Sequence, residues 1–103
     1  MRLRKTKTPE RLVKDDVKRI CQYLGILIFP IIGSLGQRPG MPDYWGIYKG
    51  QALAIECKAK GGRQSDYQKQ VQMEVEGAGG IYILAYSGAD VAKAVGAPML
   101  LED

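Results

Sequence analysis

The apolar positions near the start of the chain recur at the spacing of one helix face. Pro9 and Glu10 follow Thr8, which gives the pattern of a helix N-terminus: an N-cap, a proline at the first position and an acid in the first turn. Gly25 is placed as a C-cap. The pattern predicts a helix over residues 9–24. Its buried stripe consists of Val13, Val17, Ile20, Cys21 and Leu24. The solvent face is expected to carry Lys14, Asp15, Lys18 and Arg19.

Four apolar stretches follow the strand pattern, over residues 26–32, 44–48, 51–59 and 81–86. Pro30 interrupts the first. Lys49-Gly50 predicts a turn that joins the second and third strands into a hairpin. Residues 33–42 contain three glycines and two prolines and are expected to form a loop.

Two further helices complete the predicted order. Ser65 and Gln68 have the spacing of a capping box, which predicts a helix from there to about residue 76. A short helix is expected over residues 87–95, and the tail 97–103 could add an edge strand. Helices and strands interleaved in this way predict an α/β fold with a mixed sheet flanked by helices.

The chain of 103 residues is long enough for one domain with a modest core. We expect a protein of the cytoplasm of a bacterial or phage-infected cell and no contact with a membrane, because no apolar run reaches the length of a membrane span. The two cysteines, Cys21 and Cys57, stand in apolar patterns. They are interpreted as reduced core residues, with neither a disulfide nor a zinc site expected.

The net charge of +4 is concentrated at the N-terminus. Residues 1–8 form a basic arm, which suits a polyanion such as nucleic acid. A solvated, frayed terminus is the alternative interpretation. The cations of this arm are Arg2, Arg4, Lys5 and Lys7.

Histidine is absent, which excludes histidine general bases and histidine metal sites. The chemistry is therefore sought among carboxylates and lysines, and Asp43, Glu56 and Lys58 are the strongest candidates. Alternation along a strand places Glu56 and Lys58 on one face, opposite Leu53, Ile55 and Cys57. A charge on a mostly buried strand is costly unless it is paired or binds a metal.

Two carboxylates, Asp43 and Glu56, with the backbone carbonyl of Cys57 suit Mg²⁺ or Mn²⁺. Such an ion activates water for attack on a phosphodiester, and Lys58 is placed to orient or deprotonate that water. Glu10 could add a carboxylate through water, or act only as a partner of the helix dipole. The competing interpretation is a structural Glu56–Lys58 pair, with Asp43 as a turn residue.

Four ordered motifs resemble the VRR-Nuc family of the PD-(D/E)xK nuclease superfamily. They are Arg38-Pro39-Gly40-Met41-Pro42-Asp43, Ile55-Glu56-Cys57-Lys58, Gly62-Arg63-Gln64-Ser65-Asp66-Tyr67-Gln68, and the glycines of residues 77–80 before a strand. The resemblance covers residues 10–91. It implies a restriction-endonuclease-like fold in which Asp43 and Glu56 hold the metal, Lys58 is catalytic, and Glu10 and Gln68 match further site residues. For Gln68, the capping-box role competes with a catalytic one.

The expected activity is hydrolysis of DNA by a Mg²⁺- or Mn²⁺-dependent endonuclease. Small family members of this kind resemble phage or bacterial proteins that cut branched DNA, which implies a preference for four-way (Holliday) junctions. Linear or flapped DNA is an alternative substrate. A nucleic-acid-binding module with a vestigial site and a structural adaptor domain are the alternative classes.

Four cations flank the motifs and could contact phosphates, although each alone is more often a solvated charge. They are Arg38, Lys60, Arg63 and Lys69. We also expect a homodimer, because paired cuts need two metal sites at a fixed separation. Its apolar surface is sought in the hairpin aromatics and in the tail. These residues are Tyr44, Trp45, Ile47, Tyr48 and Met99-Leu100-Leu101.

Overall fold

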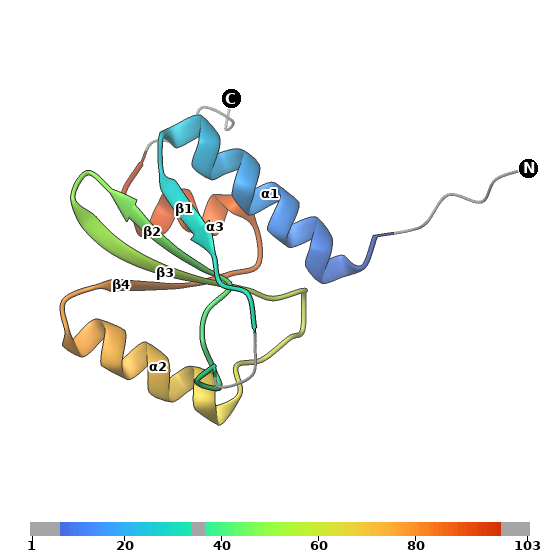
Figure 1. The fold of residues 1–103 in the computed structure, drawn as a ribbon. Helices are drawn as coiled ribbons and strands as arrows, with labels where there is room; N and C mark the ends of the chain where they lie inside the picture. Colours follow the sequence, from blue (N-terminus) through green and yellow to red (C-terminus); the bar gives the residue numbers. More distant parts are fainter. Residues whose placement is uncertain (1–6, 34–36, 98–103) are drawn as a thin grey trace, which may run out of the picture.

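The computed structural model describes residues 7–33 and 37–97. The elements follow one another in the predicted order (Figure 1). Three are helices: α1 (Pro9–Leu24), α2 (Asp66–Gly77) and α3 (Gly88–Ala94). Four are strands: β1 (Leu27–Pro30), β2 (Tyr44–Tyr48), β3 (Gln51–Cys57) and β4 (Ile81–Ala85).

The strands form one mixed sheet in the order β1-β2-β3-β4. Both pairings that involve β2 are antiparallel, and β4 adds to β3 in parallel after the α2 crossover. Within β2 and β3, Tyr48 pairs with Gln51, so the turn is Lys49-Gly50 as predicted. The α/β class with a mixed sheet is confirmed, and the arrangement is compatible with a restriction-endonuclease-like fold.

The helices lie on both sides of the sheet, with α1 and α3 on one face and α2 on the other (Figure 1). The larger core fills the first layer, where Val17 and Cys21 of α1 and Val91 of α3 pack against Leu53 and Ile55. A smaller cluster under α2 joins Ala54, Val71 and Tyr82. Strand alternation therefore sends the side chains of β3 into two different layers.

The helix ends follow the capping signals of the sequence. Thr8 accepts a hydrogen bond from the backbone of Arg11, and Gly25 ends α1 in the left-handed conformation with φ 76°. Ser65 and Gln68 form the predicted capping box at the start of α2. Gly88 begins α3 against α1, and a Cβ there would collide with the side chain of Ile20.

The predicted ends of several elements were one or two residues too long. The first strand occupies Leu27–Pro30 within the predicted 26–32. The third strand ends at Cys57 and the fourth at Ala85. Of the tail, only Ala97 is described, so the possible edge strand lies outside the described residues, as does Met99-Leu100-Leu101.

Both cysteines are buried and free, as predicted. Burial raises the pKa of the Cys21 thiol to about 11 and, together with nearby carboxylates, that of Cys57 to about 12. Both are therefore unreactive core groups near neutral pH. Within residues 7–33 and 37–97, no helix has the length and apolar character needed to cross a membrane.

Candidate functional site

Asp43 and Glu56 are brought together by the register of the β2–β3 hairpin. Tyr44 pairs with Ile55, and one further step along the two antiparallel strands sets Asp43 opposite Glu56. A hydrogen bond fixes this end of the hairpin, because the backbone N–H of Cys57 donates to Oδ2 of Asp43 at 2.7 Å. The two acids predicted from the sequence therefore stand at one end of adjacent strands.

Glu56 is a buried charged group, with a relative exposure of 5%. Its Oε2 atom accepts a hydrogen bond from Nε2 of Gln68 at 2.9 Å and lies 3.5 Å from Nζ of Lys58. Burial, reinforced by the charge of Asp43, raises the pKa of Glu56 to about 7, although Lys58 opposes that rise. Glu56 and Lys58 share one face of the sheet, as the alternation predicted.

Gln68 fills the predicted capping-box role and also contacts the candidate site. Its Oε1 accepts from the backbone N–H of Ser65 at 2.9 Å, which completes the capping box of α2. Its Nε2 donates to Glu56. One amide can do both because it has an acceptor and a donor at its two ends. The start of α2 and the acid of β3 are thereby tied together.

Gly40 lets the loop before Asp43 pack closely against the backbone of α2. Its φ is 83°, and a Cβ at this position would lie 2.5 Å from the backbone carbonyl carbon of Tyr67 in α2. Pro42 is fully buried beyond it. Only glycine allows this close approach, so the glycine of the Gly-Met-Pro-Asp sequence determines where Asp43 enters the site.

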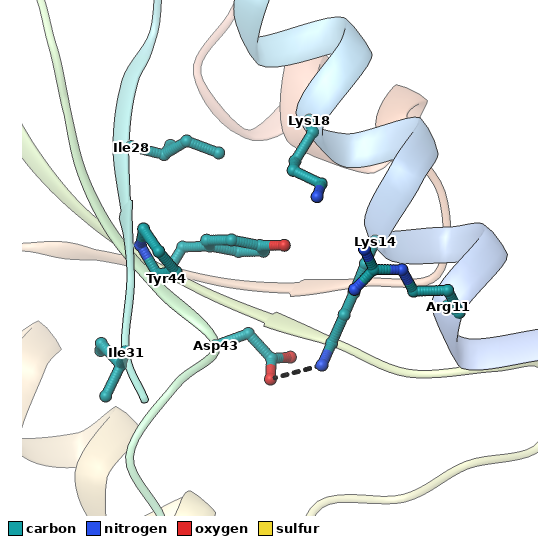
Figure 2. Close-up of a pocket in the computed structure, with 8 residues that line it drawn as sticks. Arg11, Lys14, Lys18, Ile28, Ile31, Asp43 and Tyr44 are labelled. Carbon is teal, nitrogen blue, oxygen red and sulfur yellow. Dashed lines mark ion pairs between the residues drawn. The ribbon is translucent and has the colours of Figure 1, made fainter. Parts of the chain in front are cut away.

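Lys14 corrects the prediction for α1, because it does not lie on the solvent face. Its side chain is 27% exposed, and Nζ lies 3.4 Å from Oδ1 of Asp43 (Figure 2). The same Nζ lies 3.7 Å from Oε2 of Glu10. Burial alone would lower the pKa of Lys14, but Asp43 and Glu10 raise it overall. The position is explained by spacing, since Lys14 stands three residues before Val17 and seven before Cys21, on the buried stripe.

Glu10 lies beside the site, where it pairs with Lys14. Its side chain is 48% exposed, and its contact with the site is the ion pair with Lys14. No group of three or more potential metal-ligating side chains of histidine, cysteine, aspartate or glutamate lies together in residues 7–33 and 37–97. The expected third carboxylate is thus separated from Asp43 by a lysine ammonium.

The residues present fit a hard divalent cation in their chemistry. Asp43 and Glu56 are neighbouring carboxylates, the carbonyl of Cys57 belongs to the last residue of β3, and Glu56 is buried where ionisation is unfavourable. Carboxylate and carbonyl oxygens are the ligands that Mg²⁺ and Mn²⁺ prefer. In the arrangement described here, the ammonium groups of Lys14 and Lys58 supply the positive charge beside these acids.

The cations predicted to contact DNA are dispersed around this centre. Arg38 forms a two-pronged ion pair with Glu74 of α2, with both distances 2.7 Å, so its donors already have a partner. That pairing, with a bond from Gln70, lowers the pKa of Glu74 to about 2. Three of the remaining candidates are exposed to solvent, namely Lys60, Arg63 and Lys69.

The basic arm is described only from Lys7 onward, and Nζ of Lys7 lies 2.6 Å from Oδ2 of Asp15. Arg2, Arg4 and Lys5 lie outside the described residues. The hairpin residues expected at a dimer interface differ from one another in burial. Tyr44 is 5% exposed and belongs to the core, whereas Ile47 is 47% exposed.

Comparisons of the chain with protein-family models, with curated proteins and with solved structures found no match.

Proposed function

We propose that the protein is a metal-dependent nuclease that hydrolyses phosphodiester bonds in DNA. The observation that carries the proposal is the buried Glu56 carboxylate, set beside Asp43 and held by Lys58 and Gln68. Neighbouring acids, one of them buried, are costly to a fold even with lysines beside them, and such perturbed groups cluster at functional sites. The VRR-Nuc motifs at the same residues support the same proposal.

Asp43, Glu56 and the Cys57 carbonyl would hold a Mg²⁺ or Mn²⁺ ion. The bound ion supplies a water of lowered pKa and offsets the charge on the phosphate oxygens. Gln68 keeps the Glu56 carboxylate in one orientation through its hydrogen bond to Oε2. The N–H of Cys57 does the same for Asp43, so both acids are oriented before a substrate arrives.

Lys58 is the candidate for handling the attacking water. Its side chain is 17% exposed, and its Nζ lies 3.5 Å from Oε2 of Glu56. An ammonium or amine held there can orient a water molecule beside the acids and exchange a proton with it. Glu10 is assigned no ligand role in this proposal, because Lys14 stands between it and Asp43.

Branched DNA, in particular the four-way junction, is the proposed preferred substrate, cut by a homodimer that presents two sites. An apolar area on the sheet is available for such an interface. Leu27 and Ile47 face each other across β1 and β2, and Phe29 lies on the same face, with exposures of 55%, 47% and 50%. β1 is also an edge strand. Exposed apolar residues at a sheet edge favour association.

The test is cleavage of linear, flapped and four-way DNA with Mg²⁺ or Mn²⁺, by the wild type, Asp43→Asn and Glu56→Gln. The proposal expects metal-dependent cleavage by the wild type alone, because each variant loses a charged oxygen ligand. Activity that persists in chelator would refute the mechanism. Metal-independent DNA binding with no cleavage of any substrate would favour a nucleic-acid-binding module with a vestigial site.

The dimer and the junction preference are tested separately. Light scattering at micromolar concentration should report about twice the chain mass of 11.3 kDa. A monomer that nicks linear duplex as fast as four-way junctions would rule out both, while the nuclease proposal would stand.

A further inference from the structure

A pocket of about 300 Å³ lies between α1 and the strands β1 and β2, next to Asp43. Figure 2 shows three cations of α1 facing into it, namely Arg11, Lys14 and Lys18. The opposite wall is apolar and is formed by Ile28, Pro30 and Ile31. A pocket of this size is sufficient for a small ligand. Because one wall is cationic and the other apolar, a ligand with an anionic part and an apolar part would match both walls.

The three cations share one helix face, at positions i, i+3 and i+7. Like charges at these spacings repel one another and destabilise the helix. The nearby acids compensate only in part: Asp15 lies 3.5 Å from Nε of Arg11, and Asp43 and Glu10 contact Lys14. Within residues 7–33 and 37–97, Lys18 forms no ion pair. Counting the residues that line the pocket, three cations against Asp43 leave a net charge of +2, which favours an anion.

Tyr44 adds a neutral donor at the same place. The residue is buried in the core, yet its ring projects from β2 towards α1, so the hydroxyl points to the space among the three cations (Figure 2). A tyrosine hydroxyl can donate a hydrogen bond to a phosphate oxygen.

We infer that this pocket binds one nucleotide of the DNA strand next to the bond that is cut. The phosphate group lies among Arg11, Lys14, Lys18 and the Tyr44 hydroxyl, and the sugar and base lie against Ile28, Pro30 and Ile31. The identity of the ligand as DNA rests on the proposed function. Asp43 both lines the pocket and belongs to the candidate metal site, so a nucleotide bound here places the adjoining phosphodiester beside the acids.

The inference also explains why Lys14 contacts Asp43. Without a ligand, the ammonium is held by Asp43 and Glu10. Because a lysine side chain is long and can rotate, the same group can turn to a phosphate in the pocket. Arg11, Lys14 and Lys18 were not among the residues expected to contact DNA. Lys14 and Lys18 were expected only to carry charge on the solvent face of the helix.

The first test is binding without metal, so that it does not depend on cleavage. Thymidine 5′-monophosphate is titrated in chelator into isotope-labelled protein, and NMR shifts are followed at Ile28, Ile31 and Tyr44. We expect these signals to move in the wild type. Lys18→Ala should weaken binding by about 5- to 20-fold, the range for one exposed contact to a charged group.

Arg19→Ala is the matched control, since it removes a neighbouring positive charge of α1 that pairs with Asp16 and does not line the pocket. It should change the affinity by less than about twofold. Equal weakening by Lys18→Ala and Arg19→Ala would overturn the inference, because it would indicate a diffuse charge effect. No shift of the three signals at millimolar ligand would overturn it as well.

The apolar wall is tested by comparing ligands. Thymidine monophosphate should bind more tightly than inorganic phosphate, and Ile31→Ala should reduce that difference while its backbone bond to Asp43, N to O at 2.8 Å, is retained. Equal affinity for the two ligands would overturn the assignment of a nucleotide. In that case the pocket would be an anion site only.

Kinetics separate failure of this inference from failure of the proposed function. If the protein cleaves DNA, Lys18→Ala should raise KM and leave kcat unchanged, because Lys18 does not touch the reacting atoms. Cleavage with the same KM in Lys18→Ala and Arg19→Ala would leave the nuclease standing and refute the subsite. Absence of cleavage would refute the nuclease, while the metal-free NMR titration would still decide whether a nucleotide binds.

Discussion

Replacing Glu56 by glutamine should stabilise the metal-free protein above neutral pH. The substitution keeps the shape of the side chain and keeps an acceptor for Nε2 of Gln68, which lies 2.9 Å from Oε2. It removes an ionisable group whose charged form is disfavoured by burial and by Asp43. The same substitution should abolish cleavage, so stability and function are expected to change in opposite directions.

The magnitude follows from the pKa of Glu56, which is 4.5 for the ordinary group and about 7 in the folded protein. The folded state holds this proton more tightly than the unfolded state, so the free energy of unfolding falls as the pH rises through that interval. The accumulated loss is about 3 kcal/mol. Glu56→Gln avoids this loss. Below the pH interval between the two pKa values, its free energy of unfolding should match that of the wild type.

The assay is urea unfolding in chelator, followed by the fluorescence of Trp45, at intervals from about pH 4.5 to about pH 8. The variant should be about as stable as the wild type at the acid end and more stable by up to about 3 kcal/mol at the alkaline end. Added Mn²⁺ should reduce the difference in stability between the variant and the wild type. An ion at a hundredfold excess over Kd stabilises the wild type by about 2.7 kcal/mol.

Glu74→Gln is the matched control, because its effect on the free energy of unfolding should have the opposite sign. Arg38 and Gln70 lower the pKa of Glu74 to about 2, so its charge stabilises the fold above about pH 4.5, and that contribution is lost as the pH falls towards 2. Glu74→Gln should therefore be less stable than the wild type at neutral pH. A Glu56→Gln variant that is also less stable at about pH 8 would show that pairing with Lys58 outweighs burial.

Three further predictions concern cleavage, folding and DNA binding. Lys58→Ala should abolish cleavage in a gel assay while DNA affinity stays within a few-fold, and cleavage near the wild-type rate would refute the assigned role. Gly40→Ala should lower the free energy of unfolding in urea by about 1–3 kcal/mol, because its Cβ would collide with the Tyr67 backbone; unchanged stability would contradict this close approach. Deletion of residues 1–7 should flatten the salt dependence of DNA binding, measured by fluorescence anisotropy, and an unchanged log–log slope would show that the arm does not contact DNA.

The pairing of the two acids was largely determined by local sequence. Lys49-Gly50 makes a two-residue turn, and counting outward from it sets Tyr48 opposite Gln51 and Tyr44 opposite Ile55. The next step is Asp43 opposite Glu56. Because strand register follows from the turn, this part of the site needed no information about distant contacts. The period of the apolar residues determined the helices and strands in the same way.

The roles of Gln68 and Lys14 were decided by tertiary structure. The capping-box pattern correctly predicted that Gln68 caps the start of α2. Only the packing of α2 against the sheet brings the Nε2 of Gln68 to Glu56. Lys14 stands on the buried stripe by its spacing, yet a lysine is ordinarily expected in solvent. It lies beside Asp43 because α1 crosses the sheet where β2 begins, and Asp43 offers a partner for its charge.

The burial of Glu56 depends on the assembled layers. Alternation along β3 predicted its face, but the exposure of 5% and the pKa of about 7 arise when α2 covers that face. The pocket over β1 and β2 likewise exists only after α1 lies across the strands. Turns, caps and periodicity are local properties that a sequence carries by itself. Desolvation and the meeting of charges from separate elements depend on distances that only the folded chain establishes.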